Sequence, residues 1–307
     1  MKQLAFVFPG QGSQSVGMID AFKDYSVVKS FFDRASEVLG YDLWELVTQG
    51  PAEKLNQTEF TQPALLVSSV AIWHVWCAES DLRPSVMSGH SLGEYTALVC
   101  AGALAFKDAV SLVQLRGQYM QAAVPNGQGA MAAIIGLENE VVETICRDAA
   151  ENETITPANY NSVGQVVVAG NVAAVDRAVA IAKERGAKIA KVIPVSVPSH
   201  CPLMKSAAEK LAKKLATIQM GMPEIPVIHN ANAQISKDAE QIKAALINQL
   251  YCPVRWVDVV MEMKEMGVKH IIECGPGSVL SGLNKRIDRQ LSTVSLNQPK
   301  LIQELAL

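Results

Sequence analysis

The chain has 307 residues, of which 49% are hydrophobic and only 19% charged, against roughly 25% charged residues in an average globular domain. This composition excludes an intrinsically disordered chain, and the length suits one large domain or two unequal ones. The net charge of −3 at pH 7 lacks the basic excess of a nucleic-acid-binding protein, so we expect no nucleic-acid partner.

The sequence predicts neither a membrane span nor a signal peptide. Its longest apolar stretch, residues 97–106, is ten residues long, whereas a membrane helix needs about 20. The apolar block that follows Met1 is too short for a signal peptide. The six cysteines contain no C-x-x-C pair, which indicates reduced, buried thiols. We therefore expect a cytoplasmic protein.

The first part of the chain alternates strands and helices. An apolar run at residues 4–8 stops at the glycine-rich turn 10–14, which is typical of a buried parallel strand that ends at a loop. The elements expected after it are helices over 29–46 and 63–76, a strand at 86–88 and a helix over 94–101.

From about residue 127 the expected elements follow the order β-α-β-β-α-β, which is typical of a ferredoxin-like unit. They are a strand at 130–136, a helix at 140–150, strands at 156–160 and 166–169, a helix at 173–185 and a strand at 188–194. We interpret residues 127–196 as a small inserted domain, and residues 1–126 and 197–307 as one discontinuous core.

After residue 198 the sequence again predicts helices and strands, as in the first part of the chain. Helices are expected over 203–216, 239–250 and 257–266, and strands at 227–230 and 268–274. Alternation of strands and helices on both sides of the insert predicts an α/β fold, with a parallel sheet and covering helices.

Gly89-His90-Ser91-Leu92-Gly93 matches the motif G-x-S-x-G between an expected strand and an expected helix, the context that this motif requires. The turn would project the Ser91 hydroxyl at the carboxyl edge of the sheet, with the Leu92 amide facing a developing oxyanion. We interpret Ser91 as a nucleophile. The alternative is a surface turn with an incidental serine.

A serine nucleophile needs a base, and the chain has five histidines. His200 lies between Pro198 and Pro202 at the return from the small domain, where a loop can hold a side chain over the sheet edge. We therefore predict His200 as the base. His90 adjoins Ser91 and is expected to shape the pocket. The other three have patterns typical of structural histidines: His74, His229 and His270.

The group that orients His200 stays open at this point. The Asp and Glu residues between Ser91 and His200 lie mostly in the small domain, and no pattern marks one of them as the third member of a triad. A backbone carbonyl in that position would give a Ser-His dyad. Cys201 is a rival nucleophile, but it has no second histidine nearby.

Helical spacing over residues 108–122 places Arg116 on the same apolar face as Met120. An inward guanidinium needs an anionic partner, because an unpaired buried charge costs several kcal/mol. That partner is either a buried acid of the protein or a carboxylate of the substrate, which a guanidinium binds in bidentate fashion. On the second interpretation Arg116 and Met120 belong to the substrate site.

The sequence does not match the common nucleotide-binding and metal-binding motifs. Gly10-Gln11-Gly12 is followed by Ser15 where a dinucleotide-binding loop needs glycine, and Met18 stands where a P-loop needs lysine. His90 and Glu94 have no third metal ligand near them. We expect no nucleotide cofactor and no metal.

Five blocks, taken together, resemble the malonyl-CoA:acyl-carrier-protein transacylases of bacterial fatty-acid synthesis. They follow in order over essentially the whole chain: Phe8-Pro9-Gly10-Gln11-Gly12-Ser13-Gln14, Thr61-Gln62-Pro63-Ala64, Gly89-His90-Ser91-Leu92-Gly93-Glu94, Val197-Pro198-Ser199-His200 and Gly275-Pro276-Gly277. The resemblance implies a hydrolase-like α/β core with a ferredoxin-like insert.

The resemblance also implies roles for single residues. Ser91 would be the acylated nucleophile, His200 the base and then the acid, and Arg116 the partner of the malonyl carboxylate. The remaining implied residues are the amides of Gln11 and Leu92 as an oxyanion hole, the carbonyl of Gln249 as the group that orients His200, and His90 and Gln62 as lining of the pocket.

The implied reaction is ping-pong transfer of malonyl from malonyl-CoA, through a malonyl-serine ester, to the phosphopantetheine of acyl carrier protein, by a monomer that needs no cofactor. Ser199 stands where malonyl-selective polyketide domains often carry an aromatic residue, so discrimination against methylmalonyl stays open. An acidic carrier implies a basic docking surface. The candidates are Lys183, Arg185, Lys188 and Lys191 in the small domain, and Lys285, Arg286 and Arg289 near the C-terminus.

Two other functions stay open on the sequence. A serine hydrolase would share Ser91 and His200 but release the free acid, and a carrier-binding scaffold would have no turnover. The missing triad acid and the inward Arg116 favour the transferase over the hydrolase. The presence of a nucleophile, a base and an arginine together argues against the scaffold.

Overall fold

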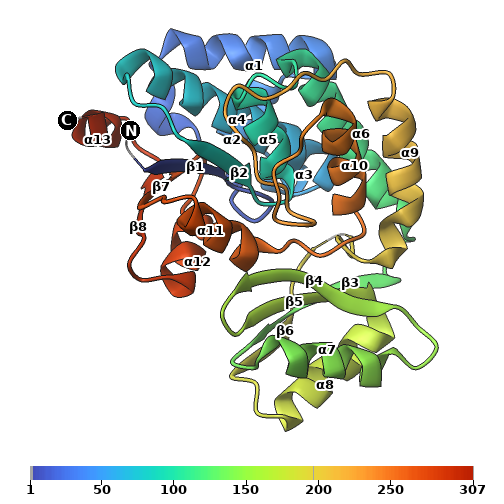
Figure 1. Cartoon of the computed structure of the whole chain (residues 1–307). Coiled ribbons are helices and arrows are strands. Elements are labelled where there is room, and N and C mark those ends of the chain that lie inside the picture. The colour runs from blue at the N-terminus through green and yellow to red at the C-terminus, as the bar shows by residue number, and fades with distance from the viewer. Residues whose placement is uncertain (1–2, 196, 307) are drawn as a thin grey trace.

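Two sheets with helices packed on them make up the computed structural model, which describes residues 3–195 and 197–306 (Figure 1). The first sheet has four parallel strands in the order β2-β1-β7-β8. They are β1 (Leu4–Phe8), β2 (Val86–Gly89), β7 (His270–Cys274) and β8 (Ser292–Leu296). The predicted α/β fold with a parallel sheet is confirmed.

Alternation along β1 explains how this sheet is covered on both faces. Phe6 and Phe8 point into one apolar cluster, and Ala5 and Val7 point into another. The larger cluster lies under α1 (Ser26–Leu39), α4 (Thr58–Glu79), α5 (Leu92–Cys100) and α6 (Phe106–Ala123), and the smaller one under α11 (Trp256–Glu265) and α12 (Val279–Ile287). A strand buried on both faces reads as a continuous apolar run, which is why β1 could be predicted.

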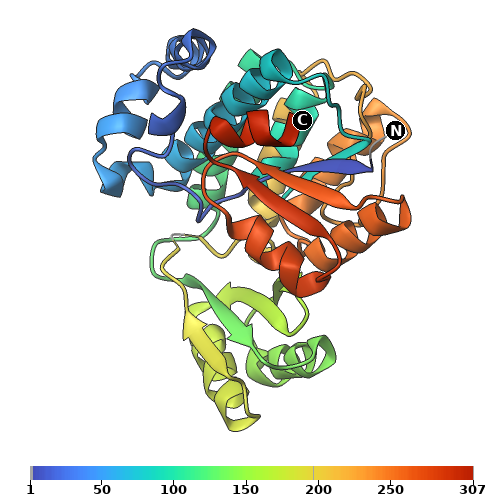
Figure 2. The same ribbon diagram turned by 90° about the vertical axis from the view of Figure 1, so that its left-hand side faces the viewer.

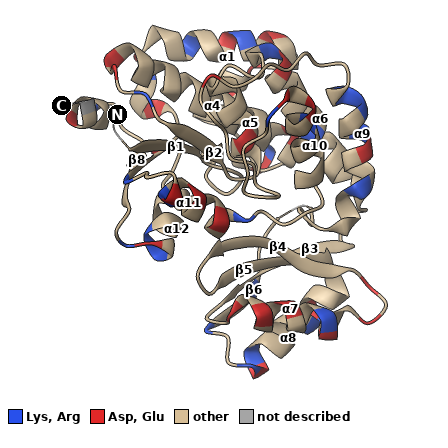
Figure 3. Cartoon of the chain, viewed as in Figure 1, with Lys and Arg blue, Asp and Glu red and all other residues tan. Residues whose placement is uncertain are grey.

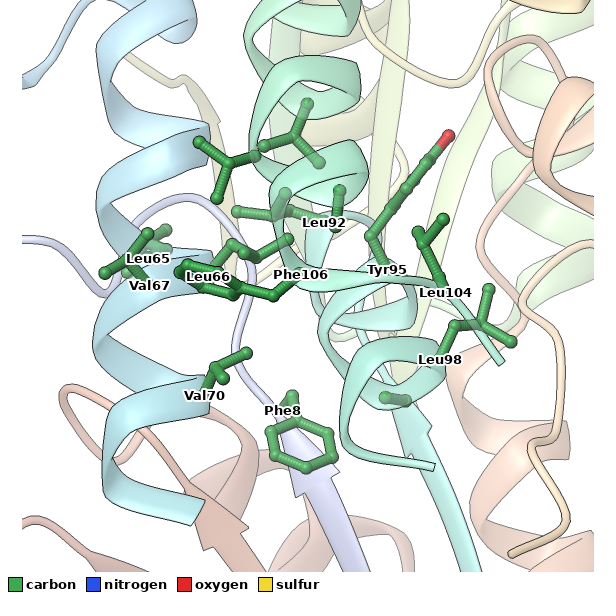
Figure 4. Close-up of a cluster of buried hydrophobic side chains, with 14 of the residues drawn as sticks. Phe8, Leu65, Leu66, Val67, Val70, Leu92, Tyr95, Leu98, Leu104 and Phe106 are labelled. Atoms are coloured by element: carbon green, nitrogen blue, oxygen red, sulfur yellow. The ribbon is translucent and has the colours of Figure 1, made fainter. Parts of the chain in front are cut away.

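The larger cluster surrounds α4, which is buried on nearly every side along residues 61–73. Figure 4 shows side chains of α4 and α5 on either side of Phe8 from β1. Phe6 meets Trp73 and Trp76 edge-on, with ring centroids 5.1 Å apart in both pairs. The remaining core helices are α2 (Leu43–Gln49), α3 (Ala52–Leu55), α9 (Lys205–Leu215), α10 (Ala239–Gln249) and α13 (Lys300–Ala306), with short 3₁₀ turns at Asp20–Phe22 and Pro202–Met204.

The second sheet is antiparallel, with the strand order β4-β5-β3-β6. Its elements are β3 (Gly129–Ile135), α7 (Asn139–Ala150), β4 (Ile155–Ser162), β5 (Gln165–Asn171), α8 (Val172–Glu184) and β6 (Ile189–Val192). Figures 1 and 2 show both helices on the face of this sheet that points away from the first sheet. The other face of the sheet is therefore available to meet the core.

Some details differ from the expectations. The helix expected over residues 29–46 is two helices, α1 and α2, because Gly40, with φ 76°, ends the first of them. The strand expected at residues 227–230 is reduced to single bridges, from Val227 to Met87 and from Ile228 to Ile235, because the N–H of Asn230 donates to the side chain of Glu94 and not to a neighbouring strand. The helix expected from residue 63 begins five residues earlier, at Thr58, and carries Pro63 inside it. Within residues 3–195 and 197–306, no helix has the length and apolar character that crossing a bilayer requires.

Candidate active site

Ser91 lies in the turn between β2 and α5, in a backbone conformation that is rare for a residue with a side chain, with φ 52° and ψ −102°. The two motif glycines allow the turn to close. A Cβ on Gly89 would lie 2.0 Å from the carbonyl of Gly93, and one on Gly93 would lie 2.0 Å from the carbonyl oxygen of Phe8. The Ser91 N–H donates to Oδ1 of Asn230 at 2.6 Å, which holds the turn in place.

His200 reaches Ser91 from the opposite side of the site. Its side chain is buried, and its Nε2 lies 2.8 Å from Oγ of Ser91. Its Nδ1 lies 2.6 Å from the carbonyl oxygen of Gln249. A carbonyl only accepts, so Nδ1 carries the proton and Nε2 is free to accept the hydroxyl proton of Ser91. This arrangement suits general-base activation of a serine.

Burial, and next the positive charge of Arg116, lower the pKa of His200 to about 3. The hydrogen bond to the carbonyl of Gln249 opposes this shift without cancelling it. The imidazole is therefore neutral, and able to accept a proton, throughout the neutral range of pH.

We expect the rate of acylation of Ser91 to be nearly independent of pH between about 5 and 8, because His200 is protonated only below its lowered pKa. A histidine with the ordinary pKa of about 6.5 would instead lose activity about tenfold for each unit below that pH. Stopped-flow acylation at each pH, with circular dichroism to confirm the fold, checks the expectation. An acid limb with its midpoint near pH 6.5 would contradict it.

Arg116, in the middle of α6, is fully buried and touches the nucleophile. Its Nη2 donates to Oγ of Ser91 at 3.1 Å and to Oε1 of Gln249 at 3.0 Å, and its Nη1 donates to Oε1 of Gln62 at 2.7 Å. Every one of these acceptors is neutral. Burial lowers the pKa of Arg116, as expected of a cation without a directly bonded anion. The first of the two sequence interpretations, a direct pair with a buried acid, is not present among the described residues.

A cavity of about 560 Å³ opens in front of Ser91 and His200, between the two sheets. Residues of the first part of the chain line it together with residues of β3, β4 and the segment after β6: Gln11, Asn56, Met131, Asn159, Ile193 and Val195. His90 also lines it, and its Nε2 lies 2.8 Å from Oδ1 of Asn161. Burial lowers the pKa of His90, which keeps this ring neutral beside the base.

The other predicted site residues lie in two layers. Gln11 lines the cavity, and Leu92 opens α5 with its side chain in the core. Gln62 and Met120 are buried and, like Arg116, lie outside the cavity lining. Oε1 of Gln62 accepts from Arg116, and its Nε2 lies 3.6 Å from Sδ of Met120. Any effect of these two residues on a substrate would therefore pass through Arg116.

A buried polar group behind the site was not predicted from the sequence. Glu94 and Asn230 are fully buried, and so is the side chain of Gln249, for which only the backbone was predicted. Glu94 accepts hydrogen bonds from the side chain of Gln249 and from the N–H of Asn230, at 2.8 and 2.9 Å. Glu94 ends the block Gly89–Glu94. Its burial could have been predicted because it is the one charged residue in α5, a helix whose other side chains are apolar or small.

Two rival chemistries find no support in the described residues. The thiol of Cys201 is buried and donates to the carbonyl of Pro198, and burial raises its pKa to about 12, so it is not a thiolate at neutral pH. Over residues 3–195 and 197–306, no group of three or more His, Cys, Asp or Glu could hold a metal ion.

The family of the chain follows from comparison with known proteins. The acyl transferase domain family matches residues 5–298. Two malonyl CoA-acyl carrier protein transacylases are similar over nearly their whole length. That of Escherichia coli (strain K12) is 54% identical over 300 residues, which is 97% of both chains, and that of Bacillus subtilis (strain 168) is 44% identical over 305 residues, which is 99% of this chain and 96% of the relative.

Solved structures agree with this relationship. The malonyl CoA-acyl carrier protein transacylase of Coxiella burnetii matches with a TM-score of 0.98 and 53% identity, over 99% of this chain and 97% of that one. A malonyl-transacylase in complex with a type II polyketide synthase acyl-carrier protein matches with a TM-score of 0.97 and 52% identity, over 99% and 98%. The chain therefore belongs to the acyl transferase family and, within it, to the malonyl-CoA:acyl-carrier-protein transacylases.

Proposed function

We propose that this acyltransferase moves the malonyl group from malonyl-CoA to the phosphopantetheine thiol of acyl carrier protein, and so supplies the extender unit of fatty-acid synthesis. The contact between Arg116 and Ser91 carries the proposal, because it sets a permanent positive charge 3.1 Å from the oxygen that would receive the acyl group. A carboxylate at the far end of that acyl group would find its partner there. The names of the relatives support the same donor and acceptor.

In the first half-reaction, Oγ of Ser91 attacks the thioester carbonyl while Nε2 of His200 takes the hydroxyl proton. The amides of Gln11 and Leu92 are proposed to bind the oxyanion. The carbon–sulfur bond then breaks, and the CoA thiol leaves with the proton from His200. In the second half-reaction the carrier thiol gives its proton to His200 and attacks the ester, and Oγ of Ser91 recovers that proton. Neither half-reaction transfers electrons, so the chemistry balances without a cofactor.

We also propose that residues 127–196 form a small ferredoxin-like domain, set on a core of residues 1–126 and 197–307. The strand order of the second sheet supports this division. In the mechanism the small domain would supply one wall of the cavity and limit the access of water, which would otherwise hydrolyse the malonyl ester. A cytoplasmic monomer completes the proposal, and sedimentation velocity together with cell fractionation would test it.

The proposed carrier would dock on a basic surface beside the cavity. Lys188 immediately precedes β6, and Lys191 lies in it. The chain after β6 lines the cavity. Neither lysine forms an ion pair within the described part of the chain. Arg185 pairs with Asp148, and Arg286 on α12 donates to Gln165 on β5, so these two cations are already engaged. Figure 3 shows basic and acidic residues mixed on α7 and α8, which makes β6 the clearer candidate.

Charge reversal at Lys188 and Lys191 (Lys→Glu at both) is expected to raise the KM for acyl carrier protein by about tenfold, the loss of about 1.4 kcal/mol of attraction. The KM for malonyl-CoA should change less. The same reversal at Lys285 and Arg289 tests the second candidate surface. Steady-state kinetics with each substrate varied in turn make the comparison. An unchanged KM for the carrier in both double variants would exclude both surfaces as docking sites.

Malonyl transfer from malonyl-CoA to holo acyl carrier protein, run beside acetyl-CoA and methylmalonyl-CoA, tests the function. We expect transfer that prefers malonyl over acetyl. Release of malonate without acylation of the carrier would indicate a serine hydrolase. If mass spectrometry detects no acyl adduct on the protein at all, the protein is a scaffold without turnover.

A further inference from the structure

A buried carboxylate lies behind the site and has no part in the mechanism above. Glu94 is in the first turn of α5 and is fully buried. Its carboxylate accepts three hydrogen bonds, from Nε2 of Gln249 at 2.8 Å, from the N–H of Asn230 at 2.9 Å and from Nδ1 of His229 at 2.8 Å. Three donors satisfy a buried negative charge, so this carboxylate is built into the site.

Gln249 connects this carboxylate to the guanidinium of Arg116 and to the imidazole of His200. Its side-chain Nε2 donates to Glu94, its Oε1 accepts from Arg116 at 3.0 Å, and its backbone oxygen accepts from Nδ1 of His200 at 2.6 Å. The amide dipole thus points its negative end at the cation and its positive end at the anion. A flipped amide would set N–H against the guanidinium and oxygen against the carboxylate, so the two charges fix one orientation.

Proton transfer creates a charge problem that this arrangement can solve. His200 becomes positive each time it takes a proton, in a buried site that already holds Arg116, and that neighbour is one cause of its lowered pKa. In a Ser-His-Asp triad the carboxylate bonded to the imidazole stabilises the imidazolium. Here the position beside His200 is held by the carbonyl of Gln249, which orients the ring but carries no net charge.

We propose that Glu94 supplies the charge of the missing triad acid from one residue further back, as a positioning residue that acts through Gln249. It stabilises the imidazolium of His200 during both half-reactions and holds the amide of Gln249 toward Arg116. Because Gln249 separates it from the guanidinium, Glu94 leaves Arg116 free to bind a substrate carboxylate. The inference rests on the proposed function, since it takes Ser91 and His200 as the residues that transfer the acyl group.

Two substitutions separate the charge of Glu94 from its shape. Glu94→Gln keeps the size and removes the charge, and the neutral amide can still meet its neighbours if His229 changes tautomer. Glu94→Asp keeps the charge on a shorter side chain. We expect the kcat for malonyl transfer to fall about tenfold or more in Glu94→Gln, while Glu94→Asp keeps several times more kcat than Glu94→Gln. The KM for malonyl-CoA should stay or fall, because Arg116 loses a nearby anion.

Glu273→Gln is the matched control. Glu273 is also a fully buried glutamate, one residue before the end of β7, but its carboxylate accepts from the N–H groups of Leu280 and Ser281 at the start of α12. We expect its kcat to match that of the unsubstituted protein. Each kcat is taken per acylatable site, counted by mass spectrometry after a burst of malonyl-CoA, so that misfolded protein does not contribute.

Two results would overturn the inference: a kcat of Glu94→Gln equal to that of the unsubstituted protein, or a Glu94→Asp variant slower than Glu94→Gln, since the latter makes shape more important than charge. Failure of the proposed function is a different result, because the unsubstituted protein itself would then not acylate the carrier.

Discussion

Ser91→Ala is expected to abolish malonyl transfer, with a fall in kcat on the order of 10⁶-fold, the scale of losing the nucleophile from a serine active site. Alanine cannot form the ester, and the one thiol beside the base, Cys201, is buried and protonated at neutral pH. Intact-protein mass spectrometry after brief exposure to malonyl-CoA, together with carrier acylation, makes the measurement.

Ser199→Ala is the control for this substitution. Ser199 lines the same cavity and adjoins the base, but among the described residues its side chain forms no hydrogen bond to Ser91, His200 or Arg116. We expect that variant to acylate normally. A malonyl adduct that persists in Ser91→Ala would move the nucleophile elsewhere and remove the basis of the mechanism.

Arg116→Ala is expected to lower kcat/KM for malonyl-CoA by about 100-fold, the loss of close to 3 kcal/mol from a charge-assisted pair with the malonyl carboxylate. Acetyl-CoA has no carboxylate, so its transfer should survive. Removing the positive charge also raises the pKa of His200, because that charge is one cause of its lowering, and a stronger base would further help acetyl transfer. The ratio of kcat/KM for the two donors is the measurement.

Arg116→Lys separates charge from geometry. Lysine keeps the positive charge but offers a single ammonium in place of the planar fork that now reaches Gln62, Gln249 and Ser91. Its malonyl preference should lie between those of the unsubstituted protein and of Arg116→Ala. Equal losses for malonyl and acetyl donors in both variants would mean that Arg116 supports the fold and does not select the acyl group.

The parts of the site that short stretches of chain specify could be predicted from the sequence. The turn around Ser91 follows from two glycines whose missing side chains let the backbone close, and the return loop of His200 follows from its prolines. The parallel sheet follows from apolar runs such as β1. Each of these depends on neighbours in sequence, so a pattern of a few residues carries the information.

The rest depends on contacts between distant residues. Glu94 meets Gln249 and Asn230 across more than 130 positions of chain, and no local pattern indicates such a pairing. The helix start at Thr58 was missed because proline usually marks a first turn, whereas Pro63 lies further inside α4. The edge strand β8 and the helix α13 have only weak local patterns and depend on the strand and helices beside them.

The two residues that exchange the hydroxyl proton share one backbone property: φ is 52° at Ser91 and 62° at His200, the left-handed region in which glycine is at ease and other residues lose about 1 to 3 kcal/mol. Selection for folding alone would therefore favour glycine at both positions. Glycine would relieve the strain, but it would also remove the hydroxyl and the imidazole that carry out the reaction. Stability and turnover are opposed at these two residues. A protein that keeps both side chains must offset this strain with stability from its core. Mutations that weaken the packing around α4 therefore reduce the free energy of unfolding that offsets the strain of this active site.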